Sequence, residues 1–455
     1  MGACSDGATG VTASVSGPIS GGSRGEPFSM PEADLAARGY VAEEFFLEGT
    51  ATSYLPAPGA TLGEDGRWDA VEDGAADFRT RVLVVRPADP SRCNGTAVVH
   101  WLNVTAGYEK GTADDEELLS GFVWVGVSAQ QVGIDGRPPG TPTSPGRSLP
   151  GDPLKTWDPQ RYRSLVHPGD EFSYDIFSQA GAVIRSGGVT GGVAVDRLVA
   201  TGPSQSGARL TTYTNAVHPL AQVYDAFMPT ITAAGGTVLE RVPAEVPLFD
   251  TSRRHIHGGF RDDLDVPVFV VNSEQETVAF GPTRRPDDDR FRFWEVAGTP
   301  HTLAMLPSPE PVPAGRVDNV LSHKPVLSAA YGAMHRWLVD GIAPPVFPPI
   351  ELESPGSIVR DARGNARGGV RLPELAAPIA EYHGRDDDFR GPLMIYGWAR
   401  PFTRDELRTL YPSRQAYADA YRRGVDDLVA AGGLRPAEVG DRYELAEKIA
   451  TDLDL

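Results

Sequence analysis

The stretch that decides the fold is Arg197-Leu-Val-Ala-Thr-Gly-Pro-Ser-Gln-Ser-Gly-Ala-Arg-Leu210. Its first half is a short apolar run that is typical of a buried strand, and its second half is compatible with a helix. Ser204 stands at the corner between them, with the small residues Gly202 and Ser206 two positions before and after it. A sharp strand-to-helix turn needs small residues at those positions because its strained backbone approaches neighbouring chain closely.

Such a corner is typical of the nucleophilic serine of the α/β-hydrolase fold, in which the amide after the serine helps to stabilise an oxyanion. We therefore predict Ser204 as a nucleophile and the amide of Gln205 as an oxyanion donor. The turn could instead be centred on Ser206, with Ser204 and Ala208 as its small flanks, or Ser204 could simply cap the helix. The predicted strand ends at Gly202, which favours Ser204.

The rest of the chain alternates between strand-like and helix-like stretches. Residues 96–102 and 122–128 are apolar on both faces and bounded by turn residues, as buried parallel strands are. Further strands are predicted at 41–47, 78–85, 197–201, 221–227, 266–272 and 290–297, and helices at 114–120, 172–185, 204–217 and 325–340, with Asp170 as an N-cap. This alternation predicts an α/β fold with a mostly parallel central sheet and helices on both faces.

Composition along the chain predicts its organisation. Residues 1–30 are rich in Gly, Ser and Thr and are expected to form a flexible arm. Residues 31–345 are predicted to form one catalytic domain with a long Pro- and Gly-rich loop insertion at 130–170, a length typical of functional loops. After residue 345 the sheet pattern stops. Residues 346–455 are expected to be a C-terminal extension that packs on the same domain and ends in helices from 404 to 452.

A serine hydroxyl needs a base to accept its proton at neutral pH. His301 lies in the loop Thr299-Pro-His-Thr302 after the strand predicted at 290–297, where this fold presents its histidine. The acid should follow the preceding strand, within Ser273-Glu-Gln-Glu-Thr277. We predict Glu276, which lies a few residues beyond the strand, and Glu274 remains the alternative.

The other histidines support weaker hypotheses. His100 lies within an apolar strand and is predicted to be a hydrogen-bonded core residue. His255 and His257 lie near Asp262 and Asp263 and could be metal ligands. An H-x-H pair in a loop is a weak indication of a metal site, so we predict neither a metal nor an organic cofactor.

The strand at 96–102 is followed by Asn103-Val-Thr-Ala-Gly107. In this fold the corresponding turn supplies a second backbone amide to the oxyanion hole. We predict the amide of Val104, with Asn103 as the alternative. The loop from 130 to 168 and the C-terminal extension are expected to shape the substrate pocket, with Arg371 as a contact to an anionic group.

Taken together, these pieces resemble the bacterial "alpha/beta hydrolase domain-containing" proteins. The resemblance spans nearly the whole chain and is carried in order by Gly39–Tyr54, Trp101–Gly107, His167–Asp170, Tyr174–Gln179, Gly202–Gly207, Gly298–His301 and Gly368–Pro373. It implies a serine hydrolase acting on a carboxylic ester or related acyl bond, with Ser204 and His301 in the catalytic roles. Where the family commonly has Glu-x-Asp, this chain has Glu274-Gln275-Glu276.

Charge and composition limit the partners. The chain has 455 residues and a formal net charge of −19, which disfavours binding to nucleic acids or anionic membranes and leaves a small-molecule ester as the expected partner. Cys4 and Cys93 form no disulfide framework.

The N-terminal residues do not show the basic and apolar regions of a signal peptide, so a cytoplasmic location is expected. The alternative functions on the same fold are those of a peptidase, a lactonase, an acyltransferase or a non-catalytic binding protein.

Overall fold

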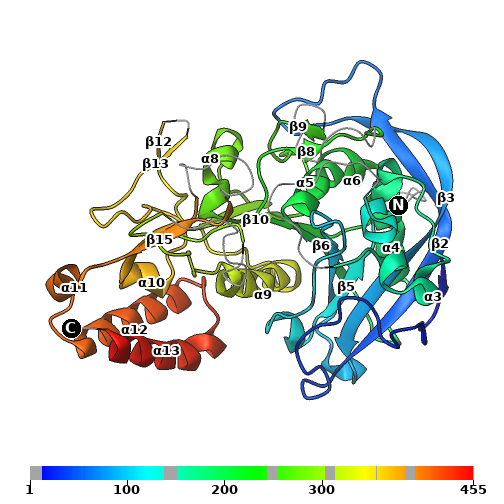
Figure 1. Cartoon of the computed structure of the whole chain (residues 1–455). Helices are drawn as coiled ribbons and strands as arrows, with labels where there is room; N and C mark the ends of the chain where they lie inside the picture. Colours follow the sequence, from blue (N-terminus) through cyan, green and yellow to red (C-terminus); the bar gives the residue numbers. More distant parts are fainter. Residues whose placement is uncertain are drawn as a thin grey trace. The chain divides into compact units, whose positions relative to one another are not determined.

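The structure is a computed structural model that describes residues 13–137, 151–242, 254–302, 313–354, 356–385 and 395–453 (Figure 1). These residues form two compact units, whose positions relative to one another are not determined. The first unit comprises residues 13–137, 151–225, 235–242 and 254–261. The second comprises residues 226–234 and the described residues from 262 to 453.

The sheet of the first unit has the strand order β1-β2-β3-β5-β4-β6. Strands β1, β2, β3 and β5 pair antiparallel, whereas β4 pairs parallel with both β5 and β6. The bounds are β1 (Ser14–Ser16), β2 (Tyr40–Pro56), β3 (Ala70–Pro87), β4 (Thr96–Trp101), β5 (Val123–Val127) and β6 (Arg197–Pro203). Every residue of β4 and β5 is buried, as expected for parallel strands covered on both faces.

Aromatic packing fixes helix α4 (Ser173–Arg185) in the first unit. The ring of Phe177 lies 4.8 Å from that of Trp101 in β4 and 4.9 Å from that of Tyr224, centroid to centroid. Such ring pairs add to the stabilisation from their buried area. The remaining elements of this unit are α1 (Gln131–Asp135), α2 (Leu154–Trp157), α3 (Pro159–Tyr162), α5 (Gln205–Thr212), a π-helical turn (Tyr213–Val217), α6 (His218–Ala221), β8 (Gly236–Thr237) and β9 (His255–Ile256).

The helix predicted at 114–120 is wrong in extent, because only a short 3-10 turn forms at Leu118–Ser120. The Asp115 side chain accepts hydrogen bonds from the amides of Glu117 and Leu118. Local side-chain acceptors of this kind compete with helical backbone bonds. Gly121 then ends the turn with φ at 141°, outside the helical region.

A fully buried charge cluster ties residues 13–28 to the first unit. Arg81 pairs with Glu44 at 2.5 Å and with Glu109 at 3.0 Å, and its guanidinium also donates to the carbonyl of Phe28. Arg161 pairs with the other oxygen of Glu44 and donates to the carbonyls of Ile19 and Gly21. The arm predicted over residues 1–30 is therefore anchored from residue 13 onward, and residues 1–12 lie outside the described residues, as do 138–150 of the predicted loop insertion.

The second unit contains three parallel strands in the order β7-β10-β11. The strand predicted at 221–227 begins later, at Ala226, because α6 extends to Ala221 and its C-cap Gln222 is left-handed. Helices α12 and α13 lie side by side in Figure 1, in agreement with the helical C-terminal end predicted from the sequence. The bounds are β7 (Ala226–Thr230), β10 (Val268–Ser273), α8 (Thr277–Phe280), β11 (Phe291–Val296), α9 (Lys324–Asp340), β12 (Leu352–Ser354), β13 (Ser357–Ile358), α10 (Pro373–Ala376), β14 (Ala380–His383), β15 (Trp398–Pro401), α11 (Arg404–Leu410), α12 (Arg414–Ala430) and α13 (Val439–Asp452).

Within the described part of the chain, none of the helices combines the length and the apolar character that crossing a bilayer requires.

Candidate active site

Ser204 lies at the corner between β6 and α5 in a strained backbone conformation, with φ at 59° and ψ at −118°. A side chain in this region costs about 1–3 kcal/mol, and such strain is typical of functional sites. A Cβ added to Gly202 would lie 2.8 Å from Cβ of Ser206, so the turn requires glycine there. Ser206 is fully buried in the helix that follows, whereas Ser204 is only partly buried.

Gln205 is the first residue of α5. The amides of a first helical turn have no acceptor within the helix, and the helix dipole makes that end electropositive. The amide of Gln205 is therefore free of helical bonding and lies directly after the Ser204 corner. Its side-chain Oε1 is buried and accepts no hydrogen bond from the described residues.

The turn after β4 is attached to the Ser204 corner through Asn103. Its Nδ2 donates to the carbonyl of Pro203 at 3.0 Å, and its Oδ1 accepts from the amide of Thr105 at 2.9 Å. The backbone amide of Asn103 donates to the carbonyl of Lys110 at 3.0 Å. That amide is occupied, whereas the amide of the neighbouring, buried Val104 has no acceptor among the described residues.

A partly buried ion pair also holds α5. Arg209 donates to Asp170 at 2.9 Å, and Asp170 also accepts from the amide of Gln131 at 2.9 Å. Burial raises the pKa of Asp170, but Arg209 and His167 hold it below its usual value. Asp170 is not the N-cap of α4, because its carboxylate is committed to Arg209 and Gln131 and no side chain caps that helix.

In the second unit, His301 and Glu276 form a direct pair. Strands β10 and β11 are parallel and in register, with Ser273 opposite Val296, so the loops that follow them leave the same edge. Nδ1 of His301 lies 2.5 Å from Oε1 of Glu276. The Glu276 side chain is 1% exposed and that of His301 18%, so the pair is shielded while the imidazole remains accessible.

The second oxygen of Glu276 is held by a capping box. The amide and the hydroxyl of Ser273 both donate to Oε2, at 2.9 and 2.6 Å. Burial raises the pKa of the Glu276 carboxyl, but the charge and hydrogen bond of His301 and the bonds from Ser273 lower it below its usual value. Glu276 is thus a buried carboxylate that stays ionised and faces an imidazole.

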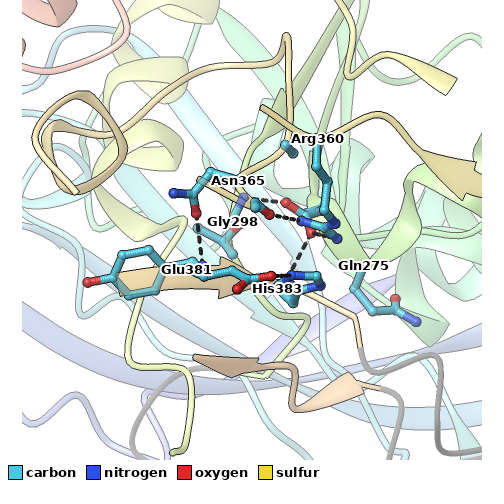
Figure 2. A network of polar contacts seen from close by, with 12 residues as sticks. Gln275, Gly298, Arg360, Asn365, Glu381 and His383 are labelled. Atoms are coloured by element: carbon cyan, nitrogen blue, oxygen red, sulfur yellow. Dashed lines mark hydrogen bonds and ion pairs between the residues drawn. The ribbon is translucent and has the colours of Figure 1, made fainter. Parts of the chain in front are cut away.

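Glu274 has different partners, two of which, Gly298 and Arg360, are labelled in Figure 2. It is fully buried and accepts hydrogen bonds from the amide of Gly298 at 2.6 Å, the amide of Gly384 at 3.0 Å and Arg360 at 2.9 Å. These partners come from the loop before His301 and from the C-terminal part of the chain. Glu274 therefore joins those segments and does not contact His301.

His323 is a neighbour of this pair that the sequence analysis missed. Burial lowers its pKa to about 4, and Glu276 and His301 both act on it electrostatically. Its ring forms a hydrogen bond with the backbone of Pro300. The acceptor is the carbonyl oxygen of Pro300, because proline has no backbone N–H. His323 thus supports the His301 loop as a neutral imidazole. No local pattern signals this role, since His323 lies 22 residues after His301 at the start of α9.

Residues 15–443 match the model of a family described as "alpha/beta hydrolase domain". The chain belongs to this alpha/beta hydrolase family. No curated protein sequence matches it.

This alpha/beta hydrolase is also similar to solved structures at low identity. Prolyl endopeptidase shares 13% identity and a TM-score of 0.30, over 58% of this chain and 36% of that one. A glucuronoyl esterase from Solibacter usitatus shares 10% identity (TM-score 0.28, over 61% and 83%). Acetyl xylan esterase 1 from Thermoanaerobacterium sp. shares 13% identity (TM-score 0.28, over 64% and 88%). The chain thus spans about a third of the endopeptidase, and with TM-scores this low none of these structures informs about its activity.

The remaining candidates of this alpha/beta hydrolase lie as follows. Arg371 donates to Asp361 and to the carbonyls of Ala366 and Leu375, all in its own segment. His100 is buried in β4 as predicted, but neither of its ring nitrogens has a hydrogen-bond partner among the described residues, so the predicted hydrogen bond is wrong. His255 lies in β9 and His257 just after it. In the described ranges no group of three or more His, Cys, Asp or Glu side chains is placed to hold a metal ion.

Proposed function

We propose that this alpha/beta hydrolase is a serine esterase that cleaves a small-molecule carboxylic ester through an acyl-enzyme. The observation that carries the proposal is the backbone of Ser204, which is held with positive φ between a parallel strand and a helix. Strain at a non-glycine residue persists only where the surrounding structure imposes it. In this fold that geometry lifts a serine Oγ clear of the sheet beside free amides.

The His301–Glu276 pair supports the assignment of base and acid. An imidazole whose Nδ1 is held by a buried carboxylate presents Nε2 as the base and gains stabilisation when it becomes charged. Glu276 has the lowered pKa and the contact that this role needs. Glu274 does not make this contact, because its oxygens accept from two amides and from Arg360.

The proposed mechanism has two half-reactions. Oγ of Ser204 attacks the ester carbonyl while His301 takes its proton and then delivers it to the leaving alcohol. The amides of Gln205 and Val104 donate to the tetrahedral oxyanion. We prefer Val104 to Asn103 because the Asn103 amide already donates to Lys110. Water, deprotonated by His301, then releases the acid and restores the Ser204 hydroxyl. The scheme uses no metal or organic cofactor.

The first experiment tests the nucleophile. A fluorophosphonate probe should label the wild-type protein, and peptide mapping should place the adduct on Ser204. The Ser204→Ala variant should lose labelling and hydrolysis of p-nitrophenyl butyrate while its circular dichroism spectrum is unchanged. Ser206→Ala is the matched control, because Ser206 is buried in the same turn, and it should retain both. An adduct on Ser206, or turnover by Ser204→Ala, contradicts the assignment.

The second experiment tests whether Ser204 and His301 act together, since they belong to different units. Residues that act as one catalytic group are strongly non-additive. Ser204→Ala and His301→Ala should each lower kcat by about 10⁴- to 10⁶-fold, and the double variant should be no slower than either single variant. Multiplicative losses in the double variant would show that the two residues act separately.

A further inference from the structure

Arg137 lies against the turn that carries the proposed oxyanion donor Val104. Its guanidinium donates to the carbonyl of Thr105, the residue after Val104. A Cβ added to Gly107 would lie 3.5 Å from Nε of Arg137, so the arginine also covers the end of this turn. The same turn reaches the Ser204 corner, because Thr105 donates to Asn103 and Asn103 donates to the carbonyl of Pro203.

The charge of Arg137 is not neutralised within the described part of the chain. The side chain is partly buried, and burial lowers its pKa. No Asp or Glu among the described residues acts on its charge, although the chain has 61 Asp and Glu against 42 Lys and Arg. The sequence that follows it, residues 138–150, contains no acidic residue.

Unused hydrogen-bonding atoms gather at the same place. Nε of Arg137 and Oγ1 of Thr105 are both buried and have no partner among the described residues. Removing a charged donor from water without a partner carries a free-energy cost that a bound anion would offset. The planar guanidinium presents parallel N–H groups that match the two oxygens of a carboxylate.

We propose that Arg137 binds a carboxylate of the substrate, so that the ester hydrolysed at Ser204 is itself an acid, such as a half-ester of a dicarboxylic acid. This inference rests on the proposed function. Ser204 acylation expels the alcohol, and attack by water then releases the dicarboxylate and one proton. Arg137 acts on a part of the substrate that does not react, so it contributes to binding and orientation and not to the chemical step.

The experiment compares monomethyl esters of succinate, glutarate and adipate with the uncharged methyl esters of equal chain length, by titrating the released acid. Arg137→Met should lower kcat/KM for the best half-ester by about ten- to a hundredfold, the range for a hydrogen bond to a charged group. Its kcat/KM for the uncharged ester should fall less, because that ester loses only the support that Arg137 gives to the Thr105 turn. Arg137→Lys, which keeps the charge but not the planar fork, should be intermediate.

Arg92→Met is the matched control for loss of one positive charge from the same unit. Arg92 is exposed and, like Arg137, donates to a backbone carbonyl, that of Arg38. This variant should treat both ester series as the wild type does. Equal losses for charged and uncharged esters in Arg137→Met, or no preference of the wild type for the half-esters, would overturn the inference while leaving the esterase proposal intact.

A binding measurement separates this inference from the proposed function. Calorimetric titration of monomethyl glutarate into Ser204→Ala reports binding without turnover. We expect binding that is weakened about ten- to a hundredfold in the Ser204→Ala/Arg137→Met double variant. If the wild type cleaves no ester but this Arg137-dependent binding is present, the anion site stands and the esterase proposal fails. Binding that is absent or independent of Arg137 overturns the anion site.

Discussion

Oε1 of Glu276 lies 2.5 Å from Nδ1 of His301, and the contact joins the loops that follow two adjacent parallel strands. Parallel strands in register end at the same edge of a sheet, so residues just beyond β10 and β11 meet although 25 positions separate them in the chain. The capping box of Ser273 holds the other carboxylate oxygen. Glu276 is thereby fixed from both sides.

Glu276→Gln should lower kcat by about 10³- to 10⁴-fold, because an amide neither stabilises charged imidazole nor enforces the required tautomer. Glu274→Gln should change kcat by less than about tenfold but lower the free energy of unfolding by about 2 kcal/mol, since it weakens the bond to Arg360. Steady-state kinetics and urea unfolding of both variants check this. A larger kcat loss in Glu274→Gln would reverse the two roles.

The lowered pKa of Glu276 also predicts a pH dependence of stability. A carboxyl with a lowered folded-state pKa stabilises the protein above the unfolded-state pKa, and this contribution is lost as pH falls through the folded-state pKa. The difference in unfolding free energy between wild type and Glu276→Gln should therefore be full at neutral pH and shrink below about pH 4.3. Urea unfolding at a series of pH values measures it, and a difference that grows on acidification would contradict the pairing.

Gly202→Ala should disrupt the Ser204 corner. The new methyl group would lie 2.8 Å from Cβ of Ser206 and 3.2 Å from a methyl carbon of Leu210, inside the packed turn. Overpacking of this kind costs about 1–3 kcal/mol, and fluorophosphonate labelling of Ser204 should slow. Gly63→Ala, where the nearest atom is 3.5 Å away, is the control and should behave as wild type in unfolding and labelling.

Ser204→Gly should be more stable than Ser204→Ala by about 1 kcal/mol. Glycine relieves a strain of about 1–3 kcal/mol at positive φ, offset in part by its larger loss of backbone entropy. Both variants lack the hydroxyl, so they compare backbone strain alone. Chemical unfolding of the pair provides the test, and equal stability would mean that Ser204 is unstrained in solution.

His100 should make the protein less stable in mild acid. Burial lowers its pKa from 6.5 to about 4, so the unfolded chain takes up a proton there before the folded protein does. Stability is then lost as pH falls from about 6.5 to about 4, by up to about 1.4 kcal/mol per pH unit. His100→Leu should flatten this decline, whereas His257→Leu, at an exposed position, should not. Parallel slopes for wild type and His100→Leu would refute the effect.

Much of the framework could be predicted from local patterns. The apolar runs at 96–102 and 122–128 correspond closely to β4 and β5, because residues buried on both faces leave a continuous apolar signal. The short 3-10 turn at Leu118–Ser120 was harder to predict. The sequence shows that Asp115 is present, but not that its side chain bonds the amides of Glu117 and Leu118 in place of helical backbone bonds. Asn103 shows the same limit, because its bond to Pro203 spans 100 positions.

The sequence by itself determined where the chain turns at Ser204 and which loops carry the candidate base and acid, because small residues at a corner and apolar runs in strands are local requirements. Only the tertiary structure shows that Glu276, and not Glu274, contacts His301. The capping motif Ser273-x-x-Glu276 is visible in the sequence, but the amide of Gly384 and the guanidinium of Arg360 that occupy Glu274 come from residues about 90 to 110 positions away. The partner of a buried carboxylate depends on which distant segments pack around it, and no local pattern encodes that.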